Sequence, residues 1–153
     1  ERGQADTVWK GSVAPHLDTY MGKVFEGMAR QAYTRYHEAW KLPADRVWGR
    51  WEGQDRNRRN IELDIVAALE DGRMLAGEVK WSSRPVGPEI HSQLLRNVED
   101  LARSGQKWAH DASRPDGARF IYYSAAGFAP AFEALARRDS RIHLVSLNEI
   151  YRS

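Results

Sequence analysis

The chain has 153 residues, of which 42% are hydrophobic and 29% charged, with no cysteine and a formal net charge of +2. This size and composition predict one soluble globular domain with a single core, and they exclude a disulfide framework or a thiolate metal site. No apolar run approaches the ~20 residues of a membrane span, and no signal peptide is visible, so we expect a cytoplasmic protein without membrane contact. Because the sequence starts at Glu1 without a methionine, we expect a fragment of a longer polypeptide.

The first part of the chain predicts a polar tail and then a helix. Residues 1–15 show no periodicity and are interpreted as a linker or tail, which leaves 16–153 as one domain. From Leu17 to Glu38 the apolar residues recur at helical spacing. Glu26 lies beside this apolar stripe, so it is either a solvated glutamate or a side chain directed at a site.

The segment from Trp40 to Asn60 is irregular, with one short strand predicted over Val47–Trp51. Basic residues alternate here with tryptophans, a pattern that suits a nucleic-acid backbone and its bases. The alternative is a solvated loop that its tryptophans anchor to the core. The candidate nucleic-acid contacts are Arg50, Arg56, Arg58 and Arg59.

A β-hairpin is predicted where two apolar runs are separated by Asp71 and Gly72. A two-residue loop would place Asp64 opposite Val79. A three-residue loop, with Gly72 in the left-handed region, pairs Asp64 with Glu78 instead. The longer loop is favoured because it produces one almost purely apolar face, which contains Ile61, Leu63, Ile65, Ala67, Leu69, Leu75, Val79 and Trp81.

The opposite face of this hairpin is charged at the end far from the turn, where it holds Glu62, Asp64, Glu78 and Lys80. Two carboxylates on neighbouring strands repel each other unless a positive group lies between them. A divalent cation with oxygen ligands fits, because Mg²⁺ takes one or two carboxylates together with waters and phosphates. Lys80 beside them is a point charge suited to a phosphate or an activated water.

The rest of the chain predicts alternating helices and strands. A helix begins at Pro88 and ends near Ser104, before Gly105. Gln93 on this helix either points at the site or lies on the surface. A polar connection over 106–117 leads to a strand over 120–124, a helix over 129–138, a strand over 142–146 and a closing segment over 147–151. This alternation predicts parallel strand pairing with helices packed on the sheet.

This order of elements resembles the PD-(D/E)XK nuclease superfamily, on the triplet Asp64…Glu78-x-Lys80 with Glu26 on the preceding helix. The similarity extends to the nuclease-like domain at the C-terminus of archaeal-type AAA+ ATPases. It covers about residues 17–151 and is carried by Tyr20-Met21-Gly22, Phe25-Glu26, Gly49-Arg50-Trp51, Glu62-x-Asp64-Ile65-Val66-Ala67, Gly77-Glu78-Val79-Lys80-Trp81 and Ser124-Ala-Ala-Gly127-Phe128. Leu63 stands where the superfamily motif has a proline.

The resemblance implies an α/β, restriction-endonuclease-like core with a mixed central sheet flanked by helices. It implies that Asp64, Glu78 and the Val79 carbonyl ligate Mg²⁺ or Mn²⁺, with Glu26 as a supporting ligand. Lys80 would orient or activate the attacking water. Glu62 and Gln93 are possible supporting residues.

Three hypotheses follow, in order of preference. The first is a metal-dependent deoxyribonuclease, which predicts that removal of Asp64 or Lys80 abolishes cleavage and leaves the fold intact. The second is a non-catalytic module that binds nucleic acid or a protein partner and is appended to an ATPase, with a steep salt dependence of DNA binding. The third is a structural or oligomerisation domain. Many nucleases of this class act as dimers, so a homo-oligomer is also considered.

Overall fold

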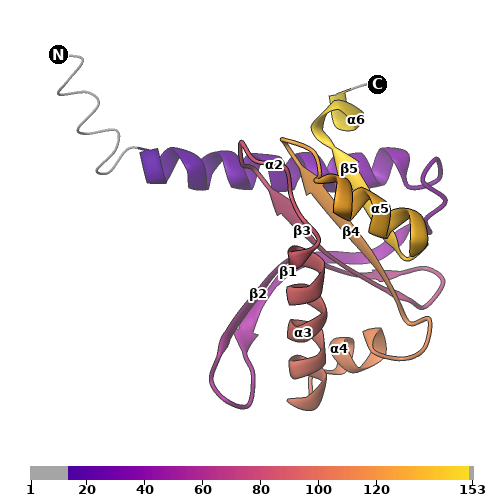
Figure 1. Ribbon diagram of the computed structural model, residues 1–153. Helices are drawn as coiled ribbons and strands as arrows, with labels where there is room; N and C mark the ends of the chain where they lie inside the picture. Colours follow the sequence, from indigo (N-terminus) through magenta and orange to yellow (C-terminus); the bar gives the residue numbers. More distant parts are fainter. Residues whose placement is uncertain (1–13, 152–153) are drawn as a thin grey trace.

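The computed structural model describes residues 14–151, with side chains described from residue 21 to residue 150. One five-stranded sheet has the order β1-β2-β3-β4-β5 (Figure 1). The first three strands pair antiparallel, and β3, β4 and β5 pair parallel. The predicted α/β class with a mixed sheet flanked by helices is therefore confirmed. The strands are β1 (Asp45–Gln54), β2 (Asn60–Leu69), β3 (Met74–Lys80), β4 (Ala118–Ser124) and β5 (Ile142–Ser146).

Helices cover both faces of the sheet (Figure 1). One hydrophobic core lies between the sheet and α2, with residues of α6 packed against it, and the other lies between the sheet and α3, α4 and α5. None of the described helices is long and apolar enough to cross a membrane. The helices are α2 (Ala14–Tyr36), α3 (Glu89–Arg103), α4 (Lys107–Ala112), α5 (Pro130–Arg138) and α6 (Leu147–Tyr151).

The turn between β2 and β3 has the predicted three-residue geometry. The Leu69 amide donates to the Arg73 carbonyl at 2.9 Å, and the ladder continues in the same register to the pair Ile65–Gly77. Gly72 has a φ of +90°, which side-chain-bearing residues rarely adopt. The register that aligns Asp64 with Glu78 is therefore the one the chain adopts.

The predicted single apolar face of β2 is wrong, because a β-bulge interrupts the strand. Gly49 pairs with Val66 but Trp51 pairs with Leu63, so two residues of β2, Asp64 and Ile65, oppose Arg50 alone. The bulge reverses the alternation of side chains along β2. Ile61 and Leu63 consequently belong to the α3 core, whereas Ile65, Ala67 and Leu69 belong to the α2 core.

Several element boundaries also differ from the prediction. β1 is ten residues long rather than five, because almost the whole of β2 pairs with it. The predicted polar connection after α3 contains a short helix, α4, since Ala109 and Ala112 are buried there and Trp108 packs against Trp51. Trp81, predicted on the apolar face, keeps 39% of its surface exposed. Residues 1–13 of the predicted tail lie outside the described residues.

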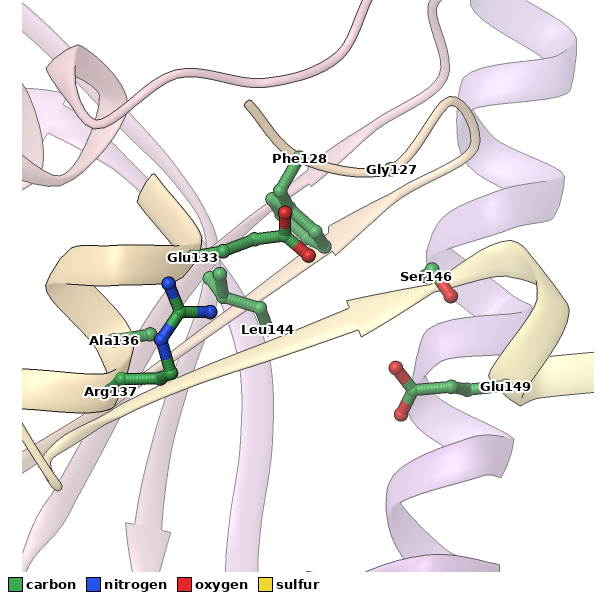
Figure 2. Close-up of a pocket in the computed structure, with 8 residues that line it drawn as sticks. All are labelled: Gly127, Phe128, Glu133, Ala136, Arg137, Leu144, Ser146 and Glu149. Carbon is green, nitrogen blue, oxygen red and sulfur yellow. The ribbon is translucent and has the colours of Figure 1, made fainter. Parts of the chain in front are cut away.

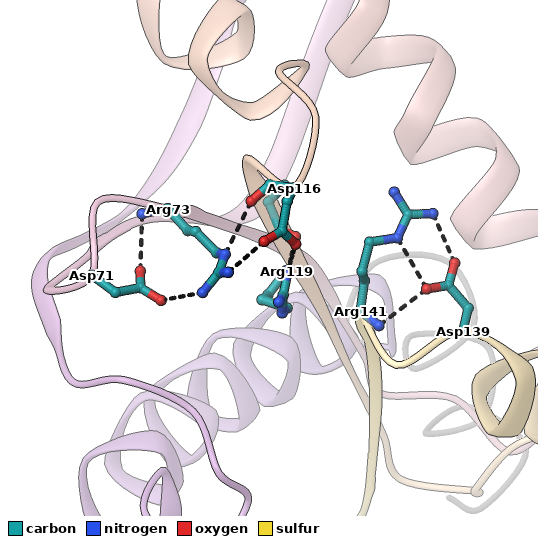
Figure 3. A network of polar contacts seen from close by, with 7 residues as sticks. Asp71, Arg73, Asp116, Arg119, Asp139 and Arg141 are labelled. Carbon is teal, nitrogen blue, oxygen red and sulfur yellow. Dashed lines mark hydrogen bonds and ion pairs between the residues drawn. The ribbon is translucent and has the colours of Figure 1, made fainter.

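Ion pairs hold together the end of the sheet at which the parallel strands begin (Figure 3). Arg73 donates to Asp71 and to Asp116, and so joins the β2–β3 turn to the segment that precedes β4. Arg141 donates to Asp139 just before β5. The opposite end of the sheet, where β3 and β4 finish, is left free of this network.

Candidate active site

Asp64 lies where β2 separates from β3. The last paired residues of these two strands are Ile65 and Gly77, whereas β3 continues to pair with β4 as far as Lys80. Beyond Gly77 the Val79 amide donates to Oδ2 of Asp64 at 2.9 Å, in place of a backbone hydrogen bond between the two strands. The bulge therefore turns the Asp64 carboxylate toward the gap between the two strands.

The Val79 carbonyl shares this gap. In an extended strand the N–H and the C=O of one residue point to the same side of the strand. The Val79 N–H points toward β2, since it donates to Asp64. Its carbonyl oxygen therefore also faces the gap and is a third oxygen donor beside the two acidic side chains.

Glu78 is the neighbour of Asp64 across this gap. Burial, followed by the negative charge of Asp64, raises the pKa of the Glu78 carboxyl from 4.5 to about 8, while Lys80 acts in the opposite direction. Such a carboxyl is held in an environment that disfavours its ionised form. A cation placed between the two carboxyl groups would reverse this penalty.

The side of Glu78 away from Asp64 contacts β4. Glu78 is paired with Tyr122, whose hydroxyl lies 2.6 Å from Nδ1 of buried His91 on α3. Lys80 is exposed and is paired with Ser124, whose hydroxyl is fully buried and has no hydrogen-bond partner among the described residues. No spacing in the sequence marks the side chains of Tyr122, Ser124 and His91, because their proximity depends on the parallel pairing of β3 with β4.

Arg50 contacts three carboxylates at once. Its guanidinium lies 3.0 Å from Glu62, 3.6 Å from Asp64 and 3.9 Å from Glu26. Its position opposite the bulge makes Arg50 the counter-ion of this acidic cluster, and its predicted contact with nucleic acid stays a prediction.

Glu26 is directed at the site from α2 and is not a freely solvated glutamate. Its side chain is 29% exposed, and burial followed by the charge of Asp64 raises its pKa, against the opposing effects of Arg50 and Lys23. Glu62 is more exposed, at 56%, and reaches the cluster only through Arg50. Both residues therefore lie close enough to influence Asp64, while their roles stay predictions.

The other predicted nucleic-acid contacts lie in the turn that joins β1 to β2. Arg59 is already paired with Asp55 and Asp100, and the Arg56 amide donates to Ser104 at the end of α3. Arg56 and Arg58 are exposed. This turn is thus fastened to α3, while Arg56 and Arg58 face solvent, and a nucleic-acid contact by these three arginines stays a prediction.

Gln93, the remaining predicted support, is exposed on α3. Its side chain donates to Asn97 and accepts a hydrogen bond from Arg96, both on the same helix. These contacts stabilise the surface of α3, and they include none of the acidic residues of the site. A role for Gln93 in the site stays a prediction.

A cleft of about 340 Å³ lies on a different part of the molecule, among α5, β5 and α6 (Figure 2). Phe128 and Leu144 supply apolar surface, and Glu133, Arg137 and Glu149 supply charge. None of the predicted site residues lines this cleft. The acidic cluster lies instead at the edge where β2 leaves β3.

The donor set around Asp64 fits a magnesium-type cation better than zinc. Within the described residues, no group of three or more His, Cys, Asp or Glu side chains is close enough together to hold a metal ion. Asp64 and Glu78 instead provide two carboxylates, and the Val79 carbonyl faces the same gap. Mg²⁺ is bound in this way, through one or two carboxylates with water and phosphate in its remaining positions.

Glu78→Gln is expected to remove the part of the pH dependence of stability that the Glu78 carboxyl causes in the presence of EDTA. Between about pH 4.5 and pH 8 the folded protein keeps the Glu78 proton that the unfolded chain has lost, so stability falls as pH rises through this window. The wild type should therefore lose about a few kcal/mol more than the variant between about pH 5 and pH 9. Urea unfolding across this range measures the difference, and parallel curves for the two proteins would contradict it.

Comparison with known proteins yields one family and several solved structures. A repair endonuclease from Pyrococcus abyssi is 16% identical, with a TM-score of 0.44, and covers 78% of this chain and 45% of its own. EndoMS, described as a dsDNA2 complex, is 12% identical over 78% of this chain and 42% of its own, with a TM-score of 0.39. EndoMS in its apo form is 14% identical over 77% and 45%, with a TM-score of 0.42.

The chain thus spans less than half the length of each of these endonuclease chains. No curated protein matches it. The family model that matches is DUF234, described as "Archaea bacterial proteins of unknown function", and the match covers residues 1–98, well over half of the chain. The chain therefore belongs to the DUF234 family of archaeal and bacterial proteins.

Proposed function

We propose that this domain hydrolyses phosphodiester bonds of DNA with the help of Mg²⁺ or Mn²⁺. Asp64, Glu78 and the Val79 carbonyl would hold the cation, and Glu26 would support it from α2. Lys80 would be the catalytic side chain next to the reacting phosphate. The single observation that carries this proposal is the gap between β2 and β3, in which a bulge directs Asp64 toward partly buried Glu78 and the backbone of Val79.

The residues divide the reaction between them. Hydrolysis adds one water across a P–O bond, so that a phosphate monoester and a free hydroxyl replace the diester. When bound, the cation lowers the pKa of water and neutralises charge on the phosphate. Lys80, exposed at the end of β3, orients the attacking water and pairs with the negative charge that develops on the phosphate oxygens. Glu78 must lose its proton to serve as a ligand.

Lys80→Met is expected to reduce DNA cleavage by roughly 100-fold or more while the affinity for Mn²⁺ stays within a few-fold of the wild type. The change removes the ammonium but leaves both carboxylates and the strand in place. Plasmid cleavage with Mn²⁺ or Mg²⁺ and calorimetric Mn²⁺ titration measure the two effects. Lys107→Met on α4 is the matched control, since Lys107 is also exposed and its one ion pair with a described residue is with Asp111. Full cleavage by the Lys80 variant would remove this residue from the mechanism.

The resemblance to ATPase-associated nuclease-like domains supports two further parts of the proposal. The domain would be joined to an AAA+ ATPase in one polypeptide, and it would act on DNA in the cytoplasm. A second copy would supply a second site where both strands are cut.

DNA binding without metal-dependent turnover would favour the non-catalytic module instead. Exposed Arg56 and Arg58 are the residues whose neutralisation would test such binding.

A further inference from the structure

The two carboxylate oxygens of Asp64 have different partners. Oδ2 accepts the Val79 amide at 2.9 Å, whereas Oδ1 faces Nη1 of Arg50 at 3.6 Å. Oδ1 is therefore the Asp64 oxygen that the backbone leaves available to a ligand. It is also the oxygen that the guanidinium of Arg50 faces.

The contacts of Arg50 are of unequal strength. Nη2 is hydrogen-bonded to Glu62 at 3.0 Å, but the approaches of Nη1 to Asp64 and Glu26 exceed hydrogen-bond distance. The Arg50 side chain is 43% exposed, so little packing restrains it. Arg50 can therefore release Asp64 and remain attached to Glu62.

We propose that Arg50 competes with the divalent cation for Oδ1 of Asp64 and thereby sets the cation affinity of the site. Glu62 is the anchor that keeps the guanidinium beside the cluster, which gives this exposed glutamate a role that needs no contact with the cation. The competition is electrostatic, because two positive groups cannot approach the same oxygen without mutual repulsion. This inference rests on the proposed function, since it assumes that Asp64 is a cation ligand.

The chain offers variants that isolate the charge of Arg50. Arg50→Met keeps much of the length of the side chain and removes the charge, whereas Arg50→Lys keeps a charge. Arg46→Met is the matched control, since Arg46 lies on the same strand, is exposed and forms no ion pair among the described residues. Far-UV circular dichroism establishes that each variant is folded.

Calorimetric titration with Mn²⁺ alone, without DNA, tests the inference. Arg50→Met is expected to bind Mn²⁺ roughly tenfold more tightly than the wild type, and Arg50→Lys and Arg46→Met within about threefold of it. A second readout is the melting temperature. Arg50→Met should melt below the wild type in EDTA, because its carboxylates have lost their counter-ion, and should gain more on addition of Mn²⁺.

The outcomes separate this inference from the proposed function. If the wild type binds Mn²⁺ through Asp64 and Arg50→Met binds no more tightly, the competition is overturned while the metal site stands. If neither protein binds Mn²⁺, both the inference and the proposed function fall. Tighter binding by Arg50→Met and Arg46→Met alike would mean a general effect of net charge, and would also overturn the role of Arg50.

Discussion

Asp64→Asn is expected to weaken Mn²⁺ binding by about 100-fold and to reduce DNA cleavage by roughly 1,000-fold. The amide oxygen of asparagine can still accept the hydrogen bond from Val79, so the separation of β2 from β3 should persist. What is lost is the negative charge that faces the gap. Arg50 would at the same time lose one of its carboxylate partners, but it would keep Glu62.

The experiment combines Mn²⁺ calorimetry with cleavage of plasmid and branched DNA on the same samples. Glu99→Gln on α3 is the control, because Glu99 is an exposed carboxylate whose one ion pair within residues 21–150 is with Arg103. The thermal melt of Asp64→Asn in EDTA should stay close to that of the wild type. Undiminished Mn²⁺ binding or cleavage by Asp64→Asn would remove Asp64 from the site.

Gly77→Ala is expected to destabilise the protein by about 3 kcal/mol or more. Gly77 lies in the middle of β3, where it forms the last residue pair with β2 before the gap and is also paired with Ile121 of β4. A methyl group at this position would collide with the carbonyl oxygen of Ile121, which is backbone and cannot rotate away. Strand β4 would have to move, and with it the side chains that line Glu78.

Gly49→Ala provides the comparison for this prediction. Gly49 is also a strand glycine, but a methyl group there meets nothing within 4 Å. Gly49→Ala should change the free energy of unfolding by no more than about 1 kcal/mol. A gain in stability is expected, because alanine lowers the conformational entropy of the unfolded chain. Urea unfolding of both variants gives the two free energies. If Gly77→Ala lowers the free energy of unfolding by less than about 1 kcal/mol, the sheet accommodates the methyl group and the prediction is wrong.

The hairpin was predictable because its determinants are local. An Asp-Gly turn and the alternation of apolar residues were enough to align Asp64 with Glu78, and Gly72 has the positive φ that this turn requires. The helix after β3 also begins and ends within one residue of its predicted limits. The order of the later strands and helices, apart from α4, and their parallel pairing followed from the same kind of pattern.

The bulge at Asp64 and Ile65 was not predictable from periodicity. A strict two-residue alternation runs through this stretch, so the sequence favours one continuous apolar face. The reversal arises because Ile61 and Leu63 pack in the core with α3, whereas Ile65 packs in the core with α2. These contacts form only in the tertiary structure. The contacts of Arg50 could not be predicted for the same reason, since Glu26 lies on α2 whereas Glu62 and Asp64 lie on β2.

The reversal within β2 also bears on how the domain folds and opens. A strand that supplied only one core would allow the other layer of helices to fray independently. Here a single strand contributes Leu63 to one core and Ile65 to the other, so neither helical layer can detach without disturbing the backbone that the other layer needs. Such sharing favours an all-or-none transition in which both layers are lost together, with no stable half-folded species.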